Sequence, residues 1–436
     1  MVFLRSQNKR IMDFIEELKW RGMFKDSTPG IEEALSKGQV VGYIGFDPTA
    51  PSMTIGNYVQ IMLLKLFQLS GHQPIVLFGG ATGRVGDPSG KDKERELKSY
   101  EELDANVAAQ IKQVKKYLDF ENGPNKAIMA NNLDFYKDMN VLDFLRDVGK
   151  TLTINYMMSK DSVKNRIETG LSFTEFSYQL LQAYDFQCLY QKFDCILQMG
   201  GSDQWGNITS GTEFIRRNIG GKAFAVTTPL LTKGDGSKFG KSTKGNLWLS
   251  PDLTSPYDFF QFWVRSNEED MPKYIKYFSL KPREEMQSMI DRLASEPQLV
   301  MEEFASEMTE RVHSKEALKV ALDVSNLLFK NAKKDTLLAM NADALGLVAE
   351  GLDKGSFTIP MSLIQNGVSI ADLMADHTEM SNSKGDVRRA IKNNAVSVNK
   401  EKISSHEFMI NQDNLLHGKY IMVENGKKNK FMVIAN

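Results

Sequence analysis

Two motifs far apart in the chain carry the residues best suited to hold a nucleoside triphosphate. The first is Tyr43–Asn57, which reads YIGFDPTAPSMTIGN, and the second is Lys238–Ser242, which reads KFGKS. Thr54–Asn57 opens a predicted helix, and the free backbone N–H groups at a helix start favour phosphate. Gly56 has no side chain, so a base or a ribose can approach the backbone there. Two lysines on a glycine-rich loop can close over a pyrophosphate and neutralise charge as it departs.

Each motif alone has a simpler explanation. Thr54–Asn57 is typical of a tight turn between a strand and a helix, and Lys238–Ser242 is typical of an exposed Lys/Gly loop. The neighbouring residues Gly45–Thr49, together with the presence of both motifs in one chain, favour the nucleotide site.

A third pattern lies between these motifs, in the segment Ser172–Gln187. Tyr178, Gln182 and Asp185 are spaced i, i+4, i+7, so they share one stripe of a predicted helix that is otherwise largely apolar. Such a polar stripe must be hydrogen-bonded to something. The pattern alone leaves open whether the partner is a core network or a polar ligand.

The residues around these patterns predict a parallel α/β sheet. A strand is predicted at Gln39–Phe46, a helix from near Ile55 with apolar residues at 3, 4, 7 spacing, and a buried strand at Ile75–Phe78. A strand, a helix and a strand in this order form a βαβ unit. Polar clusters directly follow two more predicted strands, Ala127–Met129 and Cys195–Leu197. Ligands of open α/β sheets bind outside the carboxyl ends of strands, where these clusters lie.

The remaining segments predict helices and then a second unit with strands. Residues 9–37 and 255–330 are predicted to be helical, and residues 331–360 to be a linker or packing segment. Hairpin-like strands are predicted at Ala395–Val398 and Tyr420–Val423.

Composition excludes several classes of protein. The formal net charge is −1, and there is no apolar stretch long enough to span a bilayer. The first ten residues have no apolar core typical of a secretory signal. Cys188 and Cys195 lack a CxxC spacing and the five histidines are scattered, so neither a disulfide framework nor a metal site is expected. From Ser381 to Asn436 there are ten Lys plus Arg against five Asp plus Glu, which is compatible with binding a polyanion or with a solvated surface.

The chain resembles the class I aminoacyl-tRNA synthetases, because Thr54–Asn57 stands where their HIGH motif falls and Lys238–Ser242 where KMSKS falls. The resemblance narrows to the tyrosyl-tRNA synthetases through Tyr43–Asn57, Gly79–Lys91 and Gln198–Asn207. It covers nearly the whole chain and implies an α/β fold. The implied domains are a Rossmann-like parallel-sheet catalytic domain (1–232), a KMSKS-type loop with an α-helical anticodon-binding domain (233–335), a linker (336–360) and a small α+β S4-like RNA-binding domain (361–436).

The resemblance also implies roles for individual residues. Tyr43 and Asp185 would bond the phenol hydroxyl of tyrosine. The other residues expected to bind tyrosine are Asp87, Tyr178, Gln182 and Gln204. Those expected to bind ATP are Gly45, Asp47, Gly56, Asn57, Gly201, Asp203 and Lys241. Those expected to take part in catalysis are Thr49, Thr54, Asn57, Lys91, Arg95, Lys238, Lys241 and Ser242.

One residue departs from the family pattern. The first histidine of HIGH is Thr54 here, and a threonine hydroxyl can donate a hydrogen bond but has a shorter reach. We therefore expect Thr49 and the lysines to contribute more to the stabilisation of the phosphates.

The resemblance implies a tyrosine–tRNA ligase that forms tyrosyl-adenylate from ATP, with Mg²⁺ arriving with the ATP, and then charges tRNA. A cytoplasmic homodimer is expected, with Lys384, Arg388, Arg389 and Lys392 as basic RNA-binding residues at helical spacing. Two alternatives differ from this interpretation in substrate or in activity. A tryptophan enzyme of the same class is disfavoured because indole has no hydroxyl to satisfy both Tyr43 and Asp185. A synthetase-derived RNA-binding protein without activation activity would be compatible with Thr54, but not with the lysine pair and the tyrosine pocket.

Overall fold

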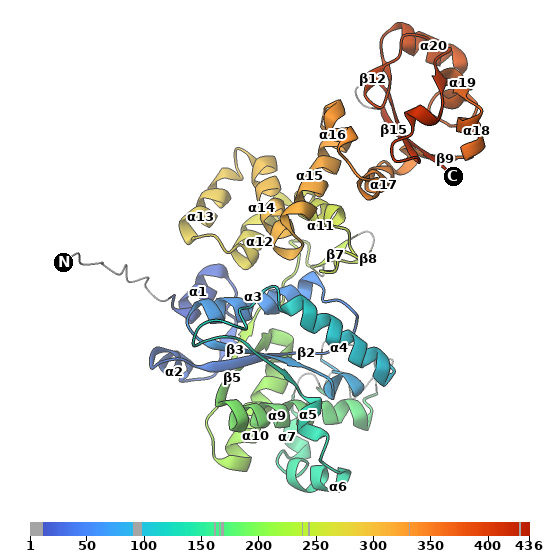
Figure 1. The fold of residues 1–436 in the computed structure, drawn as a ribbon. Coiled ribbons are helices and arrows are strands. Elements are labelled where there is room, and N and C mark those ends of the chain that lie inside the picture. Colours follow the sequence, from blue (N-terminus) through green and yellow to red (C-terminus); the bar gives the residue numbers. More distant parts are fainter. Residues whose placement is uncertain are drawn as a thin grey trace, which may run out of the picture. The chain divides into compact units, whose positions relative to one another are not determined.

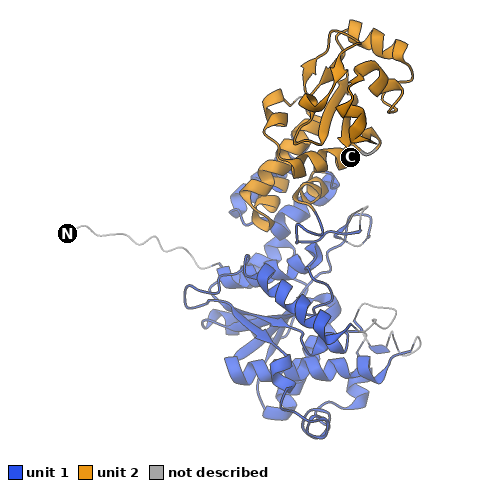
Figure 2. Cartoon of the chain, turned by 45° about the vertical axis from the view of Figure 1, so that its right-hand side comes forward, with its two compact units in different colours: residues 1–254, 265–304 blue, residues 255–264, 305–436 orange. Residues whose placement is uncertain are grey.

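The computed structural model describes residues 12–89, 98–160, 163, 164, 166, 170–237, 239–242, 245–330, 332–426 and 429–436. The chain forms two compact units, which Figure 2 shows in different colours. One comprises residues 1–254 and 265–304, and the other comprises residues 255–264 and 305–436.

The first unit is built on a six-stranded sheet with the order β1-β6-β5-β2-β3-β4 (Figure 1). The short β1 pairs antiparallel with β6, and the other neighbouring strands are parallel. The four strands that the sequence predicted are confirmed, with ends shifted by a few residues. The strands are β1 (Asp26–Ser27), β2 (Val41–Phe46), β3 (Gln73–Phe78), β4 (Ile128–Asn131), β5 (Cys195–Gly201) and β6 (Phe224–Thr228).

The order of the strands creates one crevice. The chain runs outward from β2 to β3 and β4, and then crosses to the other side of β2 to form β5 and β6. Strands β2 and β5 are therefore neighbours at the point where the strand order reverses. At such a point the loops that follow the two strands run in opposite directions, which leaves room for a ligand outside the carboxyl ends of the strands.

Helices cover both faces of this sheet. In Figure 1, α3 and α4 lie on one face and α9 and α10 on the other. The residues at the predicted 3, 4, 7 spacing of α3 are buried, but so are Ile61, Leu64 and Phe67 on its other side. The helix packs on β2 and β3 and also on α1 (Phe14–Arg21) and α12 (Met271–Phe278). The helices that cover the sheet are α3 (Ile55–Leu69), α4 (Tyr100–Val114), α9 (Phe173–Phe193) and α10 (Trp205–Ile219). The shorter elements are α5 (Leu133–Tyr136), α6 (Val141–Asp143), α7 (Ile154–Met158), η1 (Thr82–Arg84), η2 (Phe144–Val148) and η3 (Ser202–Gln204).

The N-terminal helices are shorter than predicted. Within the described part of residues 9–37, helix covers only α1 (Phe14–Arg21) and α2 (Ile31–Ser36), with β1 between them. Gly22 has φ 73°, a left-handed conformation that ends α1 and turns the chain toward the sheet edge.

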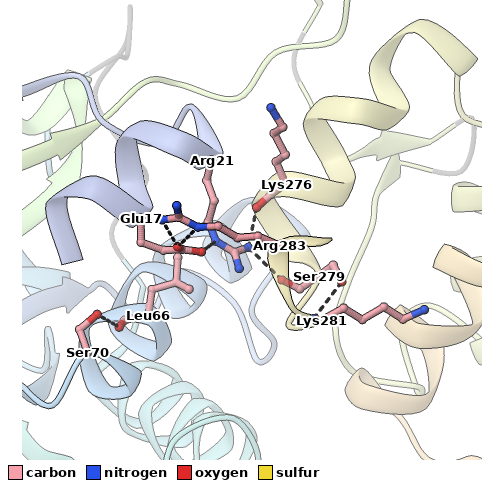
Figure 3. A network of polar contacts seen from close by, with 8 residues as sticks. All are labelled: Glu17, Arg21, Leu66, Ser70, Lys276, Ser279, Lys281 and Arg283. Carbon is pink, nitrogen blue, oxygen red and sulfur yellow. Dashed lines mark hydrogen bonds and ion pairs between the residues drawn. The ribbon is translucent and has the colours of Figure 1, made fainter. Parts of the chain in front are cut away.

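A buried ion network attaches α1 to the helices that follow the sheet (Figure 3). Glu17 accepts from Arg21 Nε (2.7 Å) and from Arg283 Nε (2.7 Å). Arg21 also donates to the backbone oxygens of Lys276 (2.6 Å) and Ser279 (2.9 Å), at the end of α12. Because the carboxylate is buried and its charge is compensated on two sides, the network fixes α12 against α1. The helices here are η4 (Glu268–Asp270), α12 (Met271–Phe278), α13 (Arg283–Arg292) and α14 (Pro297–Val312).

The second unit joins helices to a small sheet. As predicted for residues 255–330, the segment is helical, and α16 and α17 extend the helical part. The helices are α11 (Pro256–Val264), α15 (Lys315–Phe329), α16 (Lys334–Leu338) and α17 (Ala342–Gly351). Lys430 donates to three backbone oxygens at the end of α15, those of Leu327, Leu328 and Lys330, and so connects the sheet to this helix.

The small sheet has five strands in the order β12-β11-β14-β15-β9. The predicted strands near residues 395–398 and 420–423 are confirmed as β11 and β14, which pair antiparallel. Strand β9 lies within the range expected as a linker and pairs parallel with β15, so the sheet draws on residues before 361. The remaining elements are β9 (Ser356–Ile359), η5 (Asp353–Gly355), α18 (Met361–Gln365), β10 (Val368–Ser369), α19 (Ile370–Ala375), α20 (Lys384–Lys392), β11 (Val396–Val398), β12 (Glu401–Lys402), β13 (Met409–Ile410), η6 (Gln412–Asn414), β14 (Tyr420–Asn425) and β15 (Asn429–Ala435).

Candidate active site

A cavity of about 210 Å³ lies at the carboxyl ends of β2, β3 and β5, at the point where the strand order reverses. The stripe of α9 predicted from sequence forms one of its walls. All the residues expected to bind a phenolic amino acid line this cavity: Tyr43, Asp87, Tyr178, Gln182, Asp185 and Gln204. Asp87 and Gln204, which are 117 positions apart in the chain, are thus brought together.

At one end of the cavity, Tyr43 of β2 and Asp185 of α9 are both 1% exposed. The Tyr43 hydroxyl has no hydrogen-bond partner among the described residues. Burial, followed by the nearby Asp185 charge, raises the pKa of Tyr43 well above its ordinary value, so this hydroxyl keeps its proton. A buried hydroxyl without a partner is costly, and a ligand hydroxyl would satisfy it.

Asp185 is held in place by two donors that the sequence analysis did not assign. Its Oδ1 accepts from the Tyr136 hydroxyl (2.7 Å) and its Oδ2 from Asn132 Nδ2 (2.9 Å). Burial nevertheless raises the pKa of Asp185 to about 7. Asn132 follows a predicted strand and belongs to a polar cluster that the sequence showed, but Tyr136 stands one helical turn further on, where no sequence pattern marked it.

A second carboxylate, Asp47, bonds side chains from two other segments. Its Oδ2 accepts from the Tyr178 hydroxyl (2.9 Å) and its Oδ1 from Thr82 Oγ1 (2.8 Å). Burial and the Asp47 charge raise the pKa of Tyr178 well above its ordinary value. A Cβ on Gly79 would overlap both Asp47 Oδ1 and Thr82 Oγ1, which explains the glycine after β3. Thr82 was also missed, because a threonine in a Gly-rich turn carries no distinguishing pattern.

A third carboxylate, Asp87, is bonded to α10 and to the turn before it. Its Oδ2 accepts from Gln204 Nε2 (2.8 Å), and its Oδ1 accepts from the backbone N–H of Ser89 (2.9 Å). Burial, and then the charge of Asp87, raise the pKa of Asp203, which does not line the cavity. The loop after η1 and the turn before α10 thus meet at Asp87.

Three buried glutamine oxygens in the cavity wall lack partners among the described residues. They are Gln60 Oε1, Gln182 Oε1 and Gln198 Oε1. Together with the carboxylates Asp47, Asp87 and Asp185, they make the cavity rich in acceptors and in negative charge. Such a cavity suits a ligand that has a cationic donor group at one end and a hydroxyl at the other.

The segment Thr54–Asn57 forms a capping box at the start of α3. Thr54 Oγ1 donates to Asn57 Oδ1 (2.8 Å), which also accepts from the Thr54 N–H (2.9 Å). The Thr54 hydroxyl proton is therefore used inside the cap. Of the residues expected to contact a nucleotide, the cavity is lined by Gly45, Asp47, Thr49, Asn57 and Gly201.

The second motif lies directly against the start of α3. The Ile55 N–H donates to the Leu247 oxygen (2.9 Å), and the Leu247 N–H donates to the Gly240 oxygen (2.9 Å). Gly240 has φ 81°, and a Cβ there would lie 2.5 Å from Ile55 Cγ2, so a glycine is required twice over. The two motifs predicted to serve one ligand are therefore adjacent.

An aromatic anchor fixes one end of this loop. Phe239 is buried, with its ring 5.6 Å from that of Phe278 and 5.1 Å from that of Tyr274, both on α12. Lys241 is exposed at the edge of the short hairpin of β7 (Lys241–Ser242) and β8 (Gly245–Asn246). Three predicted residues, Lys91, Arg95 and Lys238, lie outside the described residues, and so does the side chain of Ser242.

The four predicted RNA-binding cations all lie on α20, but they differ in their partners. Lys384 pairs with Asp372 (2.5 Å) and Asp376 (2.7 Å), and Arg389 pairs with a carboxylate on its own helix. Arg388 and Lys392 are exposed. The sequence showed the helical spacing but not the acidic partners, since these come largely from α19 and the turn after it.

Three further features of the described residues concern cysteines, groups that could hold a metal ion and membrane-spanning helices. Cys188 and Cys195 are free thiols, and no described group of three His, Cys, Asp or Glu side chains is placed to hold a metal ion. Among the residues that the structure describes, no helix is long and apolar enough to cross a membrane.

Comparisons with known proteins find related families for two consecutive parts of the chain. Residues 35–330 match the family of class I tRNA synthetases (W and Y), and residues 352–433 match the tyrosine–tRNA ligase SYY-like C-terminal domain. The chain is 48% identical to a tyrosine–tRNA ligase of Bacteroides thetaiotaomicron over 431 residues, covering 97% of this chain and 100% of the relative. It is 50% identical to that of Cytophaga hutchinsonii over 428 residues, with the same coverage.

A solved structure is also similar. A C-terminally truncated mitochondrial tyrosyl-tRNA synthetase of Aspergillus nidulans is 31% identical, with a TM-score of 0.66, over 74% of this chain and 96% of that one.

Proposed function

The chain belongs to the tyrosine–tRNA ligases of class I, and from this premise we propose how its residues carry out the two steps of the reaction. In the first step the tyrosine carboxylate attacks the α-phosphorus of ATP, and the bond to the pyrophosphate breaks, giving tyrosyl-adenylate. In the second step a terminal ribose hydroxyl of tRNA attacks the acyl carbon and AMP leaves. The observation that carries the assignment of the substrate is the unpartnered hydroxyl of Tyr43 beside the buried carboxylate of Asp185.

Tyrosine would lie along the cavity with its phenol between Tyr43 and Asp185. Its ammonium group would bond acceptors at the other end, where Asp87, Tyr178 and Gln182 line the wall, with Gln204 holding Asp87. No protein side chain needs to act as a covalent nucleophile. The gain in rate would come from holding the carboxylate in line with the α-phosphorus and from stabilising the charge that develops.

ATP would lie across the start of α3 and the end of β5. We propose that Gly45, Asp47, Asn57 and Gly201, which line the cavity, contact the ribose and phosphates. Gly56 and Asp203 would contribute from beside it. Mg²⁺ would be bound through the ATP phosphates, as is usual for this ion.

The departing pyrophosphate would be stabilised by Thr49 and Lys241, with Lys91, Arg95, Lys238 and Ser242 as further proposed contacts. Thr54 would act mainly through the helix start, since its hydroxyl donates to Asn57. The substitution of the family histidine by threonine thus shifts the stabilisation of charge onto the lysines.

The proposed domain roles follow the expected division. Residues 1–232 would hold tyrosine and ATP, and residues 233–335 would carry the loop and the anticodon-binding helices. After a linker at 336–360, residues 361–436 would bind tRNA through Arg388 and Lys392, with Lys384 and Arg389 weakened by their ion pairs.

A homodimer in the cytoplasm is also proposed. Large apolar side chains are exposed on the short helices α6, η2 and α7 and at the start of α9, which is unusual for a monomer surface. They are Val141, Leu142, Leu145, Ile154, Met158 and Phe173. A second copy of the chain covering these residues would remove them from water.

The test of the function is tyrosine-dependent ATP–pyrophosphate exchange, with phenylalanine and tryptophan as controls. Exchange with tyrosine alone is expected. No exchange from folded protein that still binds tRNA would favour the RNA-binding alternative.

Replacing Tyr43 with phenylalanine is expected to weaken tyrosine binding by about 3–10-fold, since one neutral hydrogen bond is lost. The melting temperature should stay the same or rise slightly, because the removed hydroxyl has no partner in the described structure. Isothermal titration with tyrosine and thermal denaturation of the same samples measure both. A clear fall in melting temperature with unchanged tyrosine affinity would show that the hydroxyl is a structural group.

Removing residues 352–436 is expected to leave pyrophosphate exchange within about 2-fold of the full chain and to weaken tRNA charging at least about 10-fold. The cut precedes β9, so no strand is left without its sheet. Two full-length double variants test whether the charge of this unit matters apart from its folding. The first is Arg388→Glu with Lys392→Glu, on α20. The control is Lys115→Glu with Lys116→Glu, at exposed lysines just after α4. Only the first pair should impair charging, and normal charging by the truncated chain would refute the role of this unit.

A further inference from the structure

Amide side chains of α4 hold the loop between β2 and α3 on both sides of Thr49. Asn106 Nδ2 donates to the Pro48 oxygen (3.0 Å), and Gln110 Nε2 donates to the Ala50 oxygen (3.0 Å). The loop has no regular secondary structure there, so its carbonyl groups depend on side-chain donors.

A third amide extends this support to the end of the loop. Gln113 Oε1 accepts from the Met53 N–H (2.9 Å), and Gln113 Nε2 donates to Ser52 Oγ (2.9 Å). The same serine oxygen accepts from the Ser250 N–H (3.1 Å), in the segment that follows the KFGKS hairpin. We call Asn106, Gln110 and Gln113 the amide stripe, because their i, i+4, i+7 spacing places them on one face of α4.

The loop is also restrained by the turn that follows β3. A Cβ on Gly83 would lie 2.8 Å from Pro48 Cδ, so the turn η1 packs closely against the start of the loop. The loop around Thr49 therefore lies in contact with η1 and with the amide stripe.

One member of the amide stripe, Gln110, has a cost in stability. Asn106 and Gln110 are each 3% exposed, and Gln110 Oε1 is buried without a partner among the described residues. A methionine of similar shape would fill the same space without an unsatisfied acceptor. Gln110 instead supplies an N–H donor to the loop, and this loop carries Thr49, which lines the cavity.

We propose that Asn106 and Gln110 are positioning residues for the activation step, acting through Thr49. The inference rests on the proposed function, in which Thr49 contacts the departing pyrophosphate. Their bonds fall on the carbonyl groups of the residues before and after Thr49, so they hold the backbone on both sides of it. The amide stripe does not line the cavity and cannot bind tyrosine itself.

The test is Gln110→Met, assayed by pyrophosphate exchange and thermal denaturation. The turnover number is expected to fall about 5–10-fold, the effect of one neutral hydrogen bond. The KM for tyrosine should not change, and the melting temperature should stay the same or rise. Asn106→Leu is a second variant with the same expectation for turnover, in case either protein does not fold.

Gln68→Met is the matched control. Gln68 is also a buried glutamine whose Nε2 donates to loop carbonyls, those of Asp119 (2.7 Å) and Asn125 (3.2 Å), but that loop does not line the cavity. This variant should lose stability and keep its turnover number. A loss of turnover equal to that of Gln110→Met would assign both effects to general destabilisation and overturn the inference.

A double-mutant cycle with Thr49→Val isolates the coupling between the two residues. If the amide stripe acts through Thr49, Gln110→Met should cause less than a 2-fold further loss of turnover in the Thr49→Val protein. An undiminished loss in that background, or unchanged turnover in the single variant, would refute the proposal. A wild-type protein without tyrosine-dependent exchange would instead refute the proposed function.

Discussion

Replacing Asp185 with asparagine is expected to lower kcat/KM for tyrosine by about 10–100-fold, because a charge-assisted hydrogen bond to the phenol becomes a neutral one. The value for phenylalanine should change much less, since phenylalanine has no hydroxyl to bond. The ratio of kcat/KM for tyrosine to kcat/KM for phenylalanine should therefore fall by nearly the same factor. Pyrophosphate exchange kinetics with each amino acid measure this ratio.

The same substitution at Asp194 is the control. Asp194 ends the helix that carries Asp185, is exposed, and has φ 52°, a conformation that asparagine adopts readily. Asp194→Asn should leave kcat/KM for tyrosine and kcat/KM for phenylalanine within about 2-fold of the wild-type values. If Asp185→Asn kept its preference for tyrosine, the phenol would have to bind elsewhere.

The pH dependence provides an independent check on Asp185. Because burial raises its pKa to about 7, the carboxylate of the empty cavity becomes charged as the pH rises from about 6 to 8. Tyrosine affinity should increase over this window in the wild type and be flat in Asp185→Asn. The free energy of unfolding should change with pH in the opposite direction. Because the folded pKa of Asp185 lies above its unfolded value, the stabilisation from its protonated form is fully present below the unfolded pKa. It is lost as the pH rises through the folded pKa of about 7.

Replacing Lys241 with alanine is expected to lower the rate of adenylate formation by about 10²–10³-fold, which is the usual effect of removing one group that stabilises developing charge. The KM for tyrosine should be nearly unchanged, because Lys241 lies outside the cavity that would hold the amino acid. Pre-steady-state measurement of adenylate formation, with tyrosine binding measured separately, tests both expectations. The control is Lys116→Ala, an exposed lysine just after α4. Equal losses of binding and rate in Lys241→Ala would show that the loop has a structural role instead.

The sequence was most informative where one local pattern determines the geometry. The spacing of Tyr178, Gln182 and Asp185 was enough to predict that they share one face of a helix, because a helix repeats every 3.6 residues, and this face lines the cavity. The strands around Tyr43 were likewise predictable from short apolar runs followed by polar residues.

The parts that escaped prediction depend on contacts between distant segments. Asn132 and Tyr136 bond Asp185 from about 50 positions away, and neither has a periodic pattern of its own. Lys384 looked like a free cation in the sequence, but Asp372 and Asp376 pair with it after folding. Thr54 was expected to take part in catalysis with a shorter reach than histidine, and the sequence did not show that its hydroxyl donates to Asn57 within the cap of the helix start.

The anchoring of Phe239 affects how the loop can move. The side chain is buried between two aromatic rings of α12, and the exposed Lys241 follows only two residues later. Only Gly240 separates the lysine from this buried side chain, so its backbone is attached close to a fixed point. In the proposed contact of Lys241 with the pyrophosphate, only the few rotatable bonds between Phe239 and the ammonium group would have to be ordered, so the entropy lost on making the contact would be small.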